Sequence, residues 1–204
     1  MEENQNIEEN EINSLNQENQ ESEESKMPEI KEEQLERLDN TSQVDFLNVT
    51  PKATTPKWAI IGQGIEEIEN SYGAKTKDEH WVIEKNERHS VGGYSLSSDY
   101  EQTALKGDEV FDYIDNLKYY MKTGTDLETD KLEIDKYRVD ETGETPKYRA
   151  RLFKVIIVID SDSRKGGEDS KIKYKIQPQG DPKFGKVTFN NGVPTFTEET
   201  AASN

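Results

Sequence analysis

The sequence predicts a mainly β protein, a β-sandwich or partly open barrel with one flanking α-helix. Short apolar or alternating segments recur between residues 46 and 196, and Gly, Pro, Asn and Asp separate them. Within this strand-patterned region, only the stretch 108–121 carries apolar residues at helical spacing. A helix of this length is marginal alone in water, so its apolar face must pack on the strands around it.

Charge divides the chain into two parts. Residues 1–45 carry 15 acidic and 3 basic side chains, a net charge of −12, whereas the remaining 159 residues carry 28 and 23, a net charge of −5. We expect residues 1–45 to form an acidic, largely disordered N-terminal arm, because so few apolar side chains cannot offset the entropy of ordering. A thin apolar stripe predicts a possible short helix over 28–39. Residues 46–204 are long enough for one β domain with a single core.

Composition excludes several classes of protein. The chain has no cysteine, which excludes disulfides and cysteine metal sites. No run approaches the roughly 18 apolar residues of a membrane span, so we expect no membrane insertion. The acidic N-terminus lacks the hydrophobic region of a secretory signal. A net charge of −17 argues against a nucleic-acid-binding surface, which needs clustered Lys and Arg.

The expected strands follow in chain order. The segment 155–159 is the most apolar run and predicts a central strand. Asn190-Asn-Gly192 predicts the tight turn of a final hairpin, the prolines at 51 and 56 a linker, and 70–73 and 161–170 turns. The strand-like segments are Phe46–Val49, Lys57–Ile61, the stretch after Gly64 with Ile65 and Ile68, His80–Ile83, Ser90–Tyr100, Leu127–Tyr137, Tyr148–Ile159, Ile172–Ile176, Val187–Phe189 and Val193–Phe196.

The helix has clear start and stop signals. Asp108 is a good N-cap and acidic residues occupy the first turn. Lysines stand in the last turn and Gly124 follows as a stop. The predicted apolar face comprises Val110, Phe111, Ile114, Leu117 and Met121, and Asp112, Asp115 and Lys118 are expected to point away from it.

No catalytic, cofactor-binding or metal-binding residue is predicted. Gly62-Gln-Gly64 follows an apolar strand as in dinucleotide-binding loops, but Glu67 replaces the third glycine and a strand follows in place of a helix. Asp160, Asp162, Glu168 and Asp169 fail the EF-hand spacing, so an acidic loop is favoured over a calcium site.

The remaining residues that could carry chemistry also form no motif. His80 and His89 lack the companions of a zinc site, and no nucleophile elbow surrounds a serine. Tyr113, Tyr119 and Tyr120 are explained by amphipathic packing of the helix. We therefore expect a protein that is not an enzyme.

The order of several short motifs resembles the major tail tube protein of long-tailed phages and prophages of Gram-positive bacteria. A tryptophan strand, a strand that ends in Gln-Thr-Ala-x-Lys-Gly-Asp, a helix and a late Gly-Asp-Pro follow one another, over about three quarters of the chain. The residues that carry the resemblance are Phe46–Val49, Pro56–Ile65, Tyr100–Asp108, Val110–Asp115 and Gln179–Lys186. The arm 1–45 departs from the pattern.

The resemblance implies a structural virion protein that forms stacked hexameric rings through which DNA passes to the host cell without specific binding. It implies as partners the chain itself, a tape measure protein in the lumen, and tail terminator and distal tail proteins at the tube ends. Assembly would take place in the bacterial host cytoplasm. The predicted hairpin 68–91 would reach the next ring, and the helix would pack on the outside of the sheet that lines the lumen.

Two other classes remain open on the residues alone. One is a monomeric β-sandwich module that binds a carbohydrate or a protein partner. The other is a hydrolase on a β scaffold, which requires a pocket with converging titratable groups. Rings or tubes formed by the purified protein would distinguish a tail tube protein from both of these classes.

Overall fold

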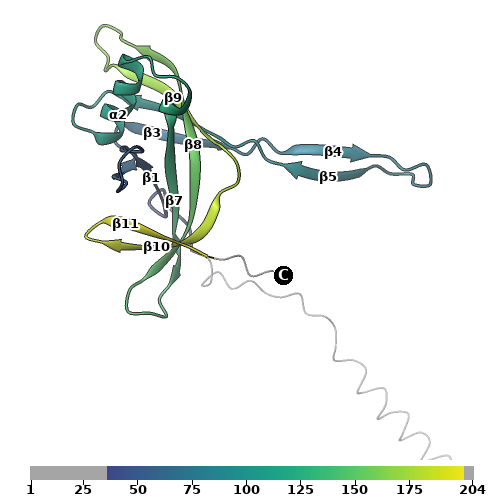
Figure 1. Cartoon of the computed structure of the whole chain (residues 1–204). Helices are drawn as coiled ribbons and strands as arrows, with labels where there is room; N and C mark the ends of the chain where they lie inside the picture. Colours follow the sequence, from purple (N-terminus) through teal and green to yellow (C-terminus); the bar gives the residue numbers. More distant parts are fainter. Residues whose placement is uncertain (1–35, 200–204) are drawn as a thin grey trace, which may run out of the picture. The chain divides into compact units, whose positions relative to one another are not determined.

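The computed structural model describes residues 36–199, and all its helices and strands lie in the unit 38–204. Within residues 36–199, one helix and a short 3₁₀ helix accompany eleven strands, and Figure 1 shows their arrangement. These are β1 (Gln43–Asn48), β2 (Trp58–Ile61), β3 (Ile65–Ser71), β4 (Lys75–Glu79), β5 (Arg88–Gly93), β6 (Ser97–Thr103), α2 (Glu109–Tyr119), η2 (Gly124–Leu127), β7 (Glu128–Asp140), β8 (Lys147–Ser163), β9 (Lys171–Pro178), β10 (Lys183–Asn190) and β11 (Val193–Glu198).

Nine of the strands form one antiparallel sheet in the order β2-β1-β7-β8-β9-β6-β3, and β10 and β11 branch from β8. The sheet curls into a half-barrel with the helix against it (Figure 1). This confirms the expected mainly β fold with one flanking helix. No helix within residues 36–199 is long and apolar enough to cross a membrane.

Strand β8 organises the sheet because it has a different neighbour along each half. Residues 148–152 pair with β10, and residues 155–163 pair with β9, while β7 runs along the other side. Between β9 and β10 the chain bends at Gly180, whose φ is +87°. The Gln179 amide donates to the Lys154 carbonyl at 2.7 Å and closes this junction. The Gly-Asp-Pro motif therefore marks the break between β9 and β10, which follow one another along the same edge of β8.

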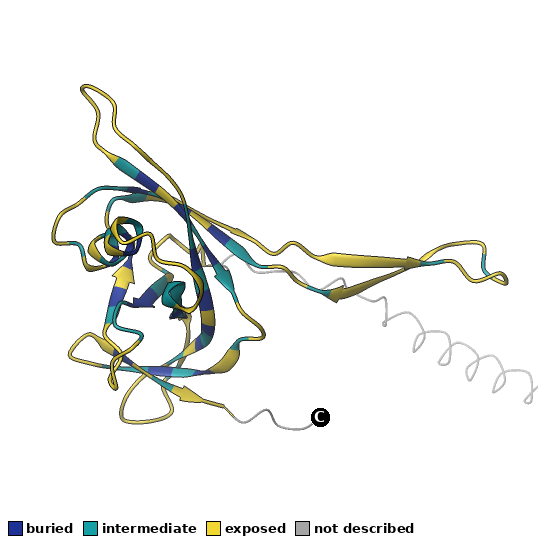
Figure 2. Ribbon diagram, turned by 45° about the horizontal axis from the view of Figure 1, so that its top comes forward, coloured by how far each residue is buried: buried dark blue, intermediate teal, exposed yellow. Residues whose placement is uncertain are grey.

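The buried side chains form two separate clusters, one on each face of the sheet. Figure 2 shows buried residues in dark blue. Side chains from β6, β8 and β9 pack with Val110, Ile114 and Leu117 of α2 on the helix-facing side. On the other side, residues of β1, β7 and β8 pack under the β10–β11 hairpin in a second cluster with Val187 at its centre. Because side chains alternate along a strand, β8 contributes Val155 to the first cluster and Ala150 to the second.

The helix begins as predicted. The Asp108 carboxylate accepts a hydrogen bond from the Phe111 amide at 2.7 Å and so caps the first turn. The predicted end is wrong, because α2 ends at Tyr119 and Met121 lies beyond it with φ +46° and 84 % exposure. The chain therefore leaves the helix before Met121 can reach the apolar face. Gly124 opens η2 in place of ending α2.

The glycine at position 185 is required where β10 passes β11. A Cβ atom there would lie 2.2 Å from the Thr197 carbonyl oxygen and 2.8 Å from the Phe196 ring. The hairpin that joins these strands turns at Asn191 and Gly192, which both have positive φ, as the Asn-Gly signal predicts.

The strand predictions are confirmed over most of the chain, but three points are wrong. The expected single strand Ser90–Tyr100 is two strands, β5 and β6, which belong to different sheets, and β4 was not predicted. His80–Ile83 is a loop at the tip of the β4–β5 hairpin and not a strand. β1 begins at Gln43, three residues before its expected start. The expected helix over 28–39 falls mostly outside the described residues, and its last four residues, 36–39, are irregular. The expected disorder of the arm concerns residues that also lie mostly outside the described range.

Candidate assembly interface

A polar ribbon continues from β3 and β6 beyond the main sheet. Strands β4 and β5 form a separate two-stranded sheet, which projects away from the half-barrel (Figure 1). Gly73, at its base, has φ +47°, and a Cβ there would lie 2.7 Å from the Ser95 carbonyl oxygen. Tyr72 and Tyr94 pack edge to face at the same place. The base of the ribbon is therefore held by side-chain and backbone packing. In contrast, β4 and β5 themselves are almost wholly exposed.

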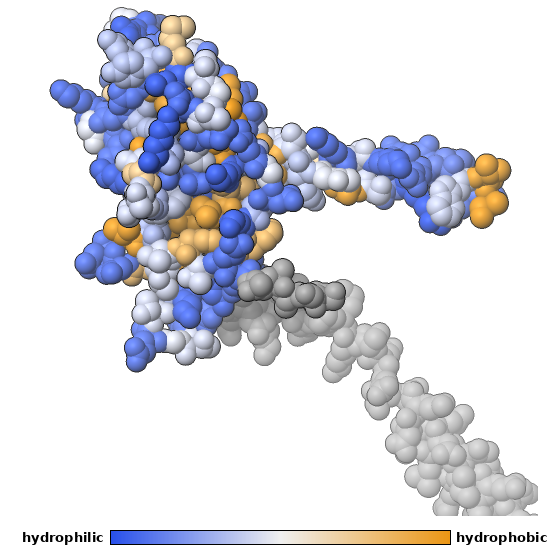
Figure 3. All heavy atoms as spheres, in the orientation of Figure 1, coloured by the Kyte–Doolittle hydropathy of each residue, from blue (hydrophilic) through white to orange (hydrophobic). Residues whose placement is uncertain are grey.

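The tip of this hairpin is apolar. Val82 is fully exposed, Ile83 is 89 % exposed and Trp81 is half exposed, with the Arg88 guanidinium 4.3 Å from the centre of the Trp81 ring. Figure 3 shows this apolar group at the end of a projection that is mostly hydrophilic. Three consecutive apolar side chains in water are costly, so the tip has the character of a surface that another molecule covers.

An apolar groove of about 620 Å³ lies on the main body of the same unit. Trp58 and Ile60 of β2 form one wall, and Leu105, in the loop before α2, forms another. Ile60 and Leu105 are each at least 40 % exposed. The unit therefore carries a protruding apolar tip and a concave apolar groove.

The face of β3, β6 and β9 turned away from α2 is charged. Glu101 pairs with Lys171 and Lys173 at 2.6 Å, and Lys175 lies 3.5 Å from Asp99. The lysine hydrogen bonds lower the pKa of Glu101 to about 2. A shallow depression on this face is lined by five carboxylates and two lysines, so acidic groups predominate: Glu67, Glu69, Asp99, Glu101, Asp160, Lys173 and Lys175.

A buried glutamine joins the motifs that carry the family resemblance. Gln102 is fully buried, and its Nε2 donates to the Gln63 carbonyl and to Asp108 Oδ1, both at 2.9 Å. Its Oε1 accepts from the Tyr174 hydroxyl at 3.2 Å. One side chain therefore connects the Gly-Gln-Gly loop, the N-cap of α2 and strand β9. This explains physically why Gln102 and Asp108 stand at this spacing.

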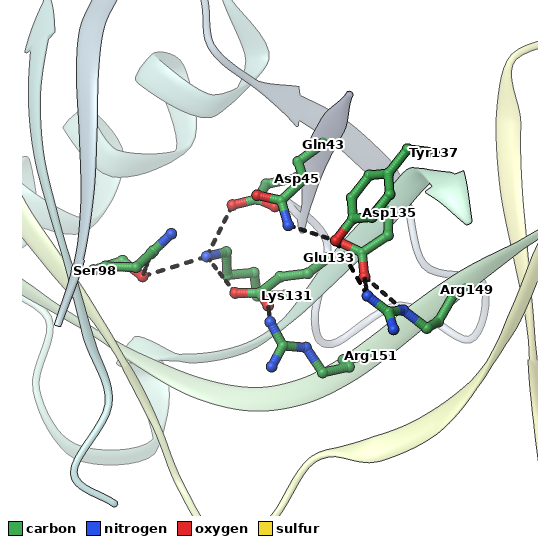
Figure 4. A network of polar contacts seen from close by, with 10 residues as sticks. Gln43, Asp45, Ser98, Lys131, Glu133, Asp135, Tyr137, Arg149 and Arg151 are labelled. Carbon is green, nitrogen blue, oxygen red and sulfur yellow. Dashed lines mark hydrogen bonds and ion pairs between the residues drawn. The ribbon is translucent and has the colours of Figure 1, made fainter. Parts of the chain in front are cut away.

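A charge network lies inside the half-barrel (Figure 4). Lys131 is 2 % exposed, and its Nζ lies 3.0 Å from Asp45 Oδ2, 2.9 Å from Glu133 Oε1 and 3.4 Å from Ser98 Oγ. Arg151 pairs with Glu133 at 2.7 Å. Further out, Asp135 accepts hydrogen bonds from Gln43 and Arg149. A cavity of about 470 Å³ borders Asp45, Glu133 and Arg151.

Burial and pairing act against each other in this network. Burial raises the pKa of Asp45, and the Lys131 charge offsets only part of that effect. Burial alone would lower the pKa of Lys131, but Asp45, Tyr100 and Glu133 outweigh it and raise the pKa. Sequence reasoning missed this cluster, because charged residues that alternate with Leu132 and Ile134 are typical of a strand with one solvated face.

The glycines considered for dinucleotide binding have a structural role. Gly62 and Gly64 form the bend between β2 and β3, and Gly64 has φ +72°. A Cβ at Gly64 would lie 2.9 Å from the Thr103 carbonyl oxygen, so close packing explains this residue. The strand after the bend leaves no helix N-terminus for a phosphate.

The acidic residues in the last part of β8 and in the loop after it are not gathered into a cation site. Asp160 and Asp162 lie on β8 and pair with Lys175 and Lys118, and Glu168 pairs with Lys165. Among residues 36–199, one exposed group, Asp78, Glu87 and His89, brings three potential ligand atoms together. Cross-strand pairing of Asp78 with His89 at 2.7 Å accounts for it.

The tyrosines of the helix divide between core and surface. Tyr113 packs against the core under α2, whereas Tyr119 and Tyr120 are 75 % and 64 % exposed and contact each other. His80 lies in the exposed tip, away from the interior of the unit.

Comparison with solved structures identifies the fold. The chain is similar to one from the tail of an empty gene transfer agent particle with C6 symmetry, with a TM-score of 0.51, 12 % identity, and coverage of 72 % of this chain and 98 % of that one. A chain of the native gene transfer agent virion gives 0.49 at 11 % identity, covering 72 % and 98 %. A sheath–tube complex of an extracellular contractile injection system gives 0.41 at 8 % identity, covering 71 % and 88 %. The sequence matches no protein-family model and no curated protein.

Proposed function

We propose that this chain is a structural subunit of a tail tube in a phage, a prophage or a related particle, and that it acts by self-assembly without catalysis. The observation that carries the proposal is the similarity of fold to a chain of a C6-symmetric tail, over nearly the whole of that chain. The order of the sequence motifs supports the same assignment and extends it to long-tailed phages and prophages of Gram-positive bacteria.

The proposed assembly is a stack of hexameric rings. A tube built by repetition needs heterologous contacts, in which one surface of a subunit meets a different surface of the next. The apolar tip at Trp81–Ile83 and the groove at Trp58, Ile60 and Leu105 are two such unlike surfaces on one chain. We propose that the β4–β5 hairpin reaches a subunit of the next ring and that the groove is the surface that it meets.

The charged face of β3, β6 and β9 is the proposed wall of the lumen. Its opposite side is covered by α2, which would leave the helix on the outside of the lining sheet. Carboxylates predominate around Glu101 and Asp99, so DNA phosphates would be repelled and would pass without adhering. In this arrangement the tape measure protein would occupy the same lumen, and terminator and distal tail proteins would close the ends.

Negative-stain electron microscopy of the purified full chain tests the proposal. Rings or tubes with a central channel are expected, because the subunit carries both contact surfaces. A species that stays monomeric at high concentration would contradict the proposal and favour a monomeric binding module.

A surface variant tests the role of the hairpin. Replacing Val82 and Ile83 with serine should leave the fold intact and prevent rings from stacking, because the apolar contact is lost. The matched control replaces the exposed Tyr119 with serine, outside the tip and the groove. If the tip variant formed stacks of normal length, the hairpin would not be the contact between rings.

A further inference from the structure

Lys131 occupies a position where a lysine is unexpected. Directly opposite it stand Leu47 on β1 and Phe153 on β8, both buried, and the Tyr100 ring lies 5.8 Å from Nζ. An ammonium ion loses its hydration here, and a buried ion pair is seldom more stable than apolar side chains of the same volume. Its position in the middle of the sheet therefore calls for a role other than simple packing.

The two carboxylates beside Lys131 are not equivalent. Glu133 Oε2 lies 2.7 Å from Arg151, so this carboxylate has a second cationic partner besides Lys131. Among residues 36–199, the ion pair of Asp45 is with Lys131 alone, and burial favours its neutral form. Asp45 is thus suited to react as a neutral acid, which leaves Glu133 to accept a proton.

We propose that Lys131 and Asp45 form an intramolecular amide bond that links β7 covalently to β1. Nζ lies 3.0 Å from Oδ2 of Asp45, so the carboxyl carbon Cγ is one bond further away. On β1, Asp45 stands directly opposite Glu133 of β7, and Lys131 is two residues from Glu133 along β7. Lys131 and Asp45 are therefore diagonal neighbours across the two strands, a separation that a long lysine side chain spans. The reacting atoms are held together by the sheet before any reaction occurs.

The reaction needs no external reagent. The Lys131 ammonium passes one proton to the Asp45 carboxylate, which gives a neutral amine and a neutral acid and removes two buried charges. The Nζ lone pair attacks Cγ, Glu133 accepts the second proton from nitrogen, and it returns that proton to the departing hydroxyl. The C–O bond breaks, the C–N bond forms and one water molecule leaves.

Several neighbouring groups are poor alternatives. Arg149 and Arg151 remain protonated and are weak nucleophiles. Glu133 lies on the same strand as Lys131, so an amide between them would bridge adjacent positions of one face and hold no second strand. A bond to Asp45 instead closes a long segment of chain. Since the chain has no cysteine, this amide would supply a covalent cross-link that disulfides cannot.

Intact-mass measurement of the purified, denatured full chain tests the proposal. The expected mass is lower than that of the sequence by one water molecule. Proteolysis should yield one branched peptide that joins the Asp45 and Lys131 segments, with no tryptic cleavage after Lys131. A folded protein that keeps its full mass after prolonged incubation would overturn the proposal.

Variants provide chemical controls that do not depend on stability. In Asp45→Asn the leaving group becomes ammonia, so the mass deficit should change from one water to one ammonia. Glu133→Gln should slow the loss of water at least tenfold, because the proton acceptor is gone. Lys186 and Asp140 form a half-buried ion pair at 2.9 Å and serve as the internal control, which should stay unlinked. A branched peptide at both sites would show unspecific condensation and would also overturn the proposal.

Discussion

The region under α2 and the β4–β5 hairpin differ in where their apolar side chains lie. Under the helix, Ile114, Leu117 and Val155 are buried, and even the polar Gln102 has its hydrogen bonds satisfied. In the hairpin, the most apolar side chains, such as Val82, are the most exposed. Apolar burial inside the subunit accounts for the first region, whereas the second becomes favourable only when another molecule covers it. The comparison separates residues that make the fold from residues available for assembly.

The largest effect is expected from Ile114→Asp. Ile114 is fully buried between α2 and the sheet, so the new carboxylate would have no partner there. We expect a loss of more than about 4 kcal/mol, enough to prevent folding. Circular dichroism and thermal melting measure it, with Asp112→Ala on the exposed side of the helix as control. A folded Ile114→Asp protein that assembles normally would contradict the central role given to the helix.

A smaller loss is expected from Gly185→Ala. The added methyl group would clash with the Thr197 carbonyl and the Phe196 ring, which forces β11 away from β10. The expected cost is about 1–3 kcal/mol by chemical denaturation. Gly143→Ala is the matched control, since a Cβ there has no atom within 4 Å. Equal stability of the two variants would show that β11 can shift freely.

Gln102→Leu tests the polar hub of the core. The variant leaves Asp108, the Gln63 carbonyl and the Tyr174 hydroxyl without this partner, and we expect a loss of about 1–3 kcal/mol. Hydrogen exchange should increase most at the N-terminal turn of α2. Exchange that rises evenly over the sheet would argue against a local role for this glutamine.

Glu101→Gln should have a small effect that depends on pH. Lys171 and Lys173 lower the pKa of Glu101 from its ordinary value of 4.5 to about 2 in the folded state. The stabilisation is therefore complete above pH 4.5 and is lost as the pH falls towards 2. Wild-type protein should lose slightly more stability than the variant across that window. Parallel pH profiles would mean that solvent screens these pairs completely.

The smallest effect on folding is expected from the tip variant with serine at positions 82 and 83. Both side chains are exposed in the subunit, so the unfolding free energy should change by less than about 0.5 kcal/mol. Stacking of the rings, measured by sedimentation, should nevertheless be lost. A large drop in stability would show that the tip packs within its own subunit.

The fold was predictable where local pattern and burial agree. The run 155–159 and the capped helix at Asp108 are recognisable because period and capping chemistry act within a few residues. The tip at His80–Ile83 was not predictable, since a short apolar run has the same composition in a buried strand and in an exposed turn. Only the polar strands on either side, which the structure pairs with each other, decide between them.

The charge network was hidden for a different reason. Lys131 and Glu133 alternate with buried Leu132 and Ile134, a pattern typical of a strand with one face in water. In the curled sheet both faces of β7 are enclosed. Ser98 and Tyr100 of β6 reach Lys131 on one face, and Val187 of β10 packs with Leu132 and Ile134 on the other. Curvature arises from the whole sheet and leaves no signal in the sequence around one residue.

A helical reconstruction of the assembled particle is the most direct test of the proposed tube. We expect a hollow tube in which Glu101 and Asp99 face the channel and α2 lies outside the lining sheet. Val82 of each subunit should be buried in the groove beside Trp58 of a subunit in the next ring. A particle with the charged face on its exterior, or with the hairpin free in solvent, would contradict it.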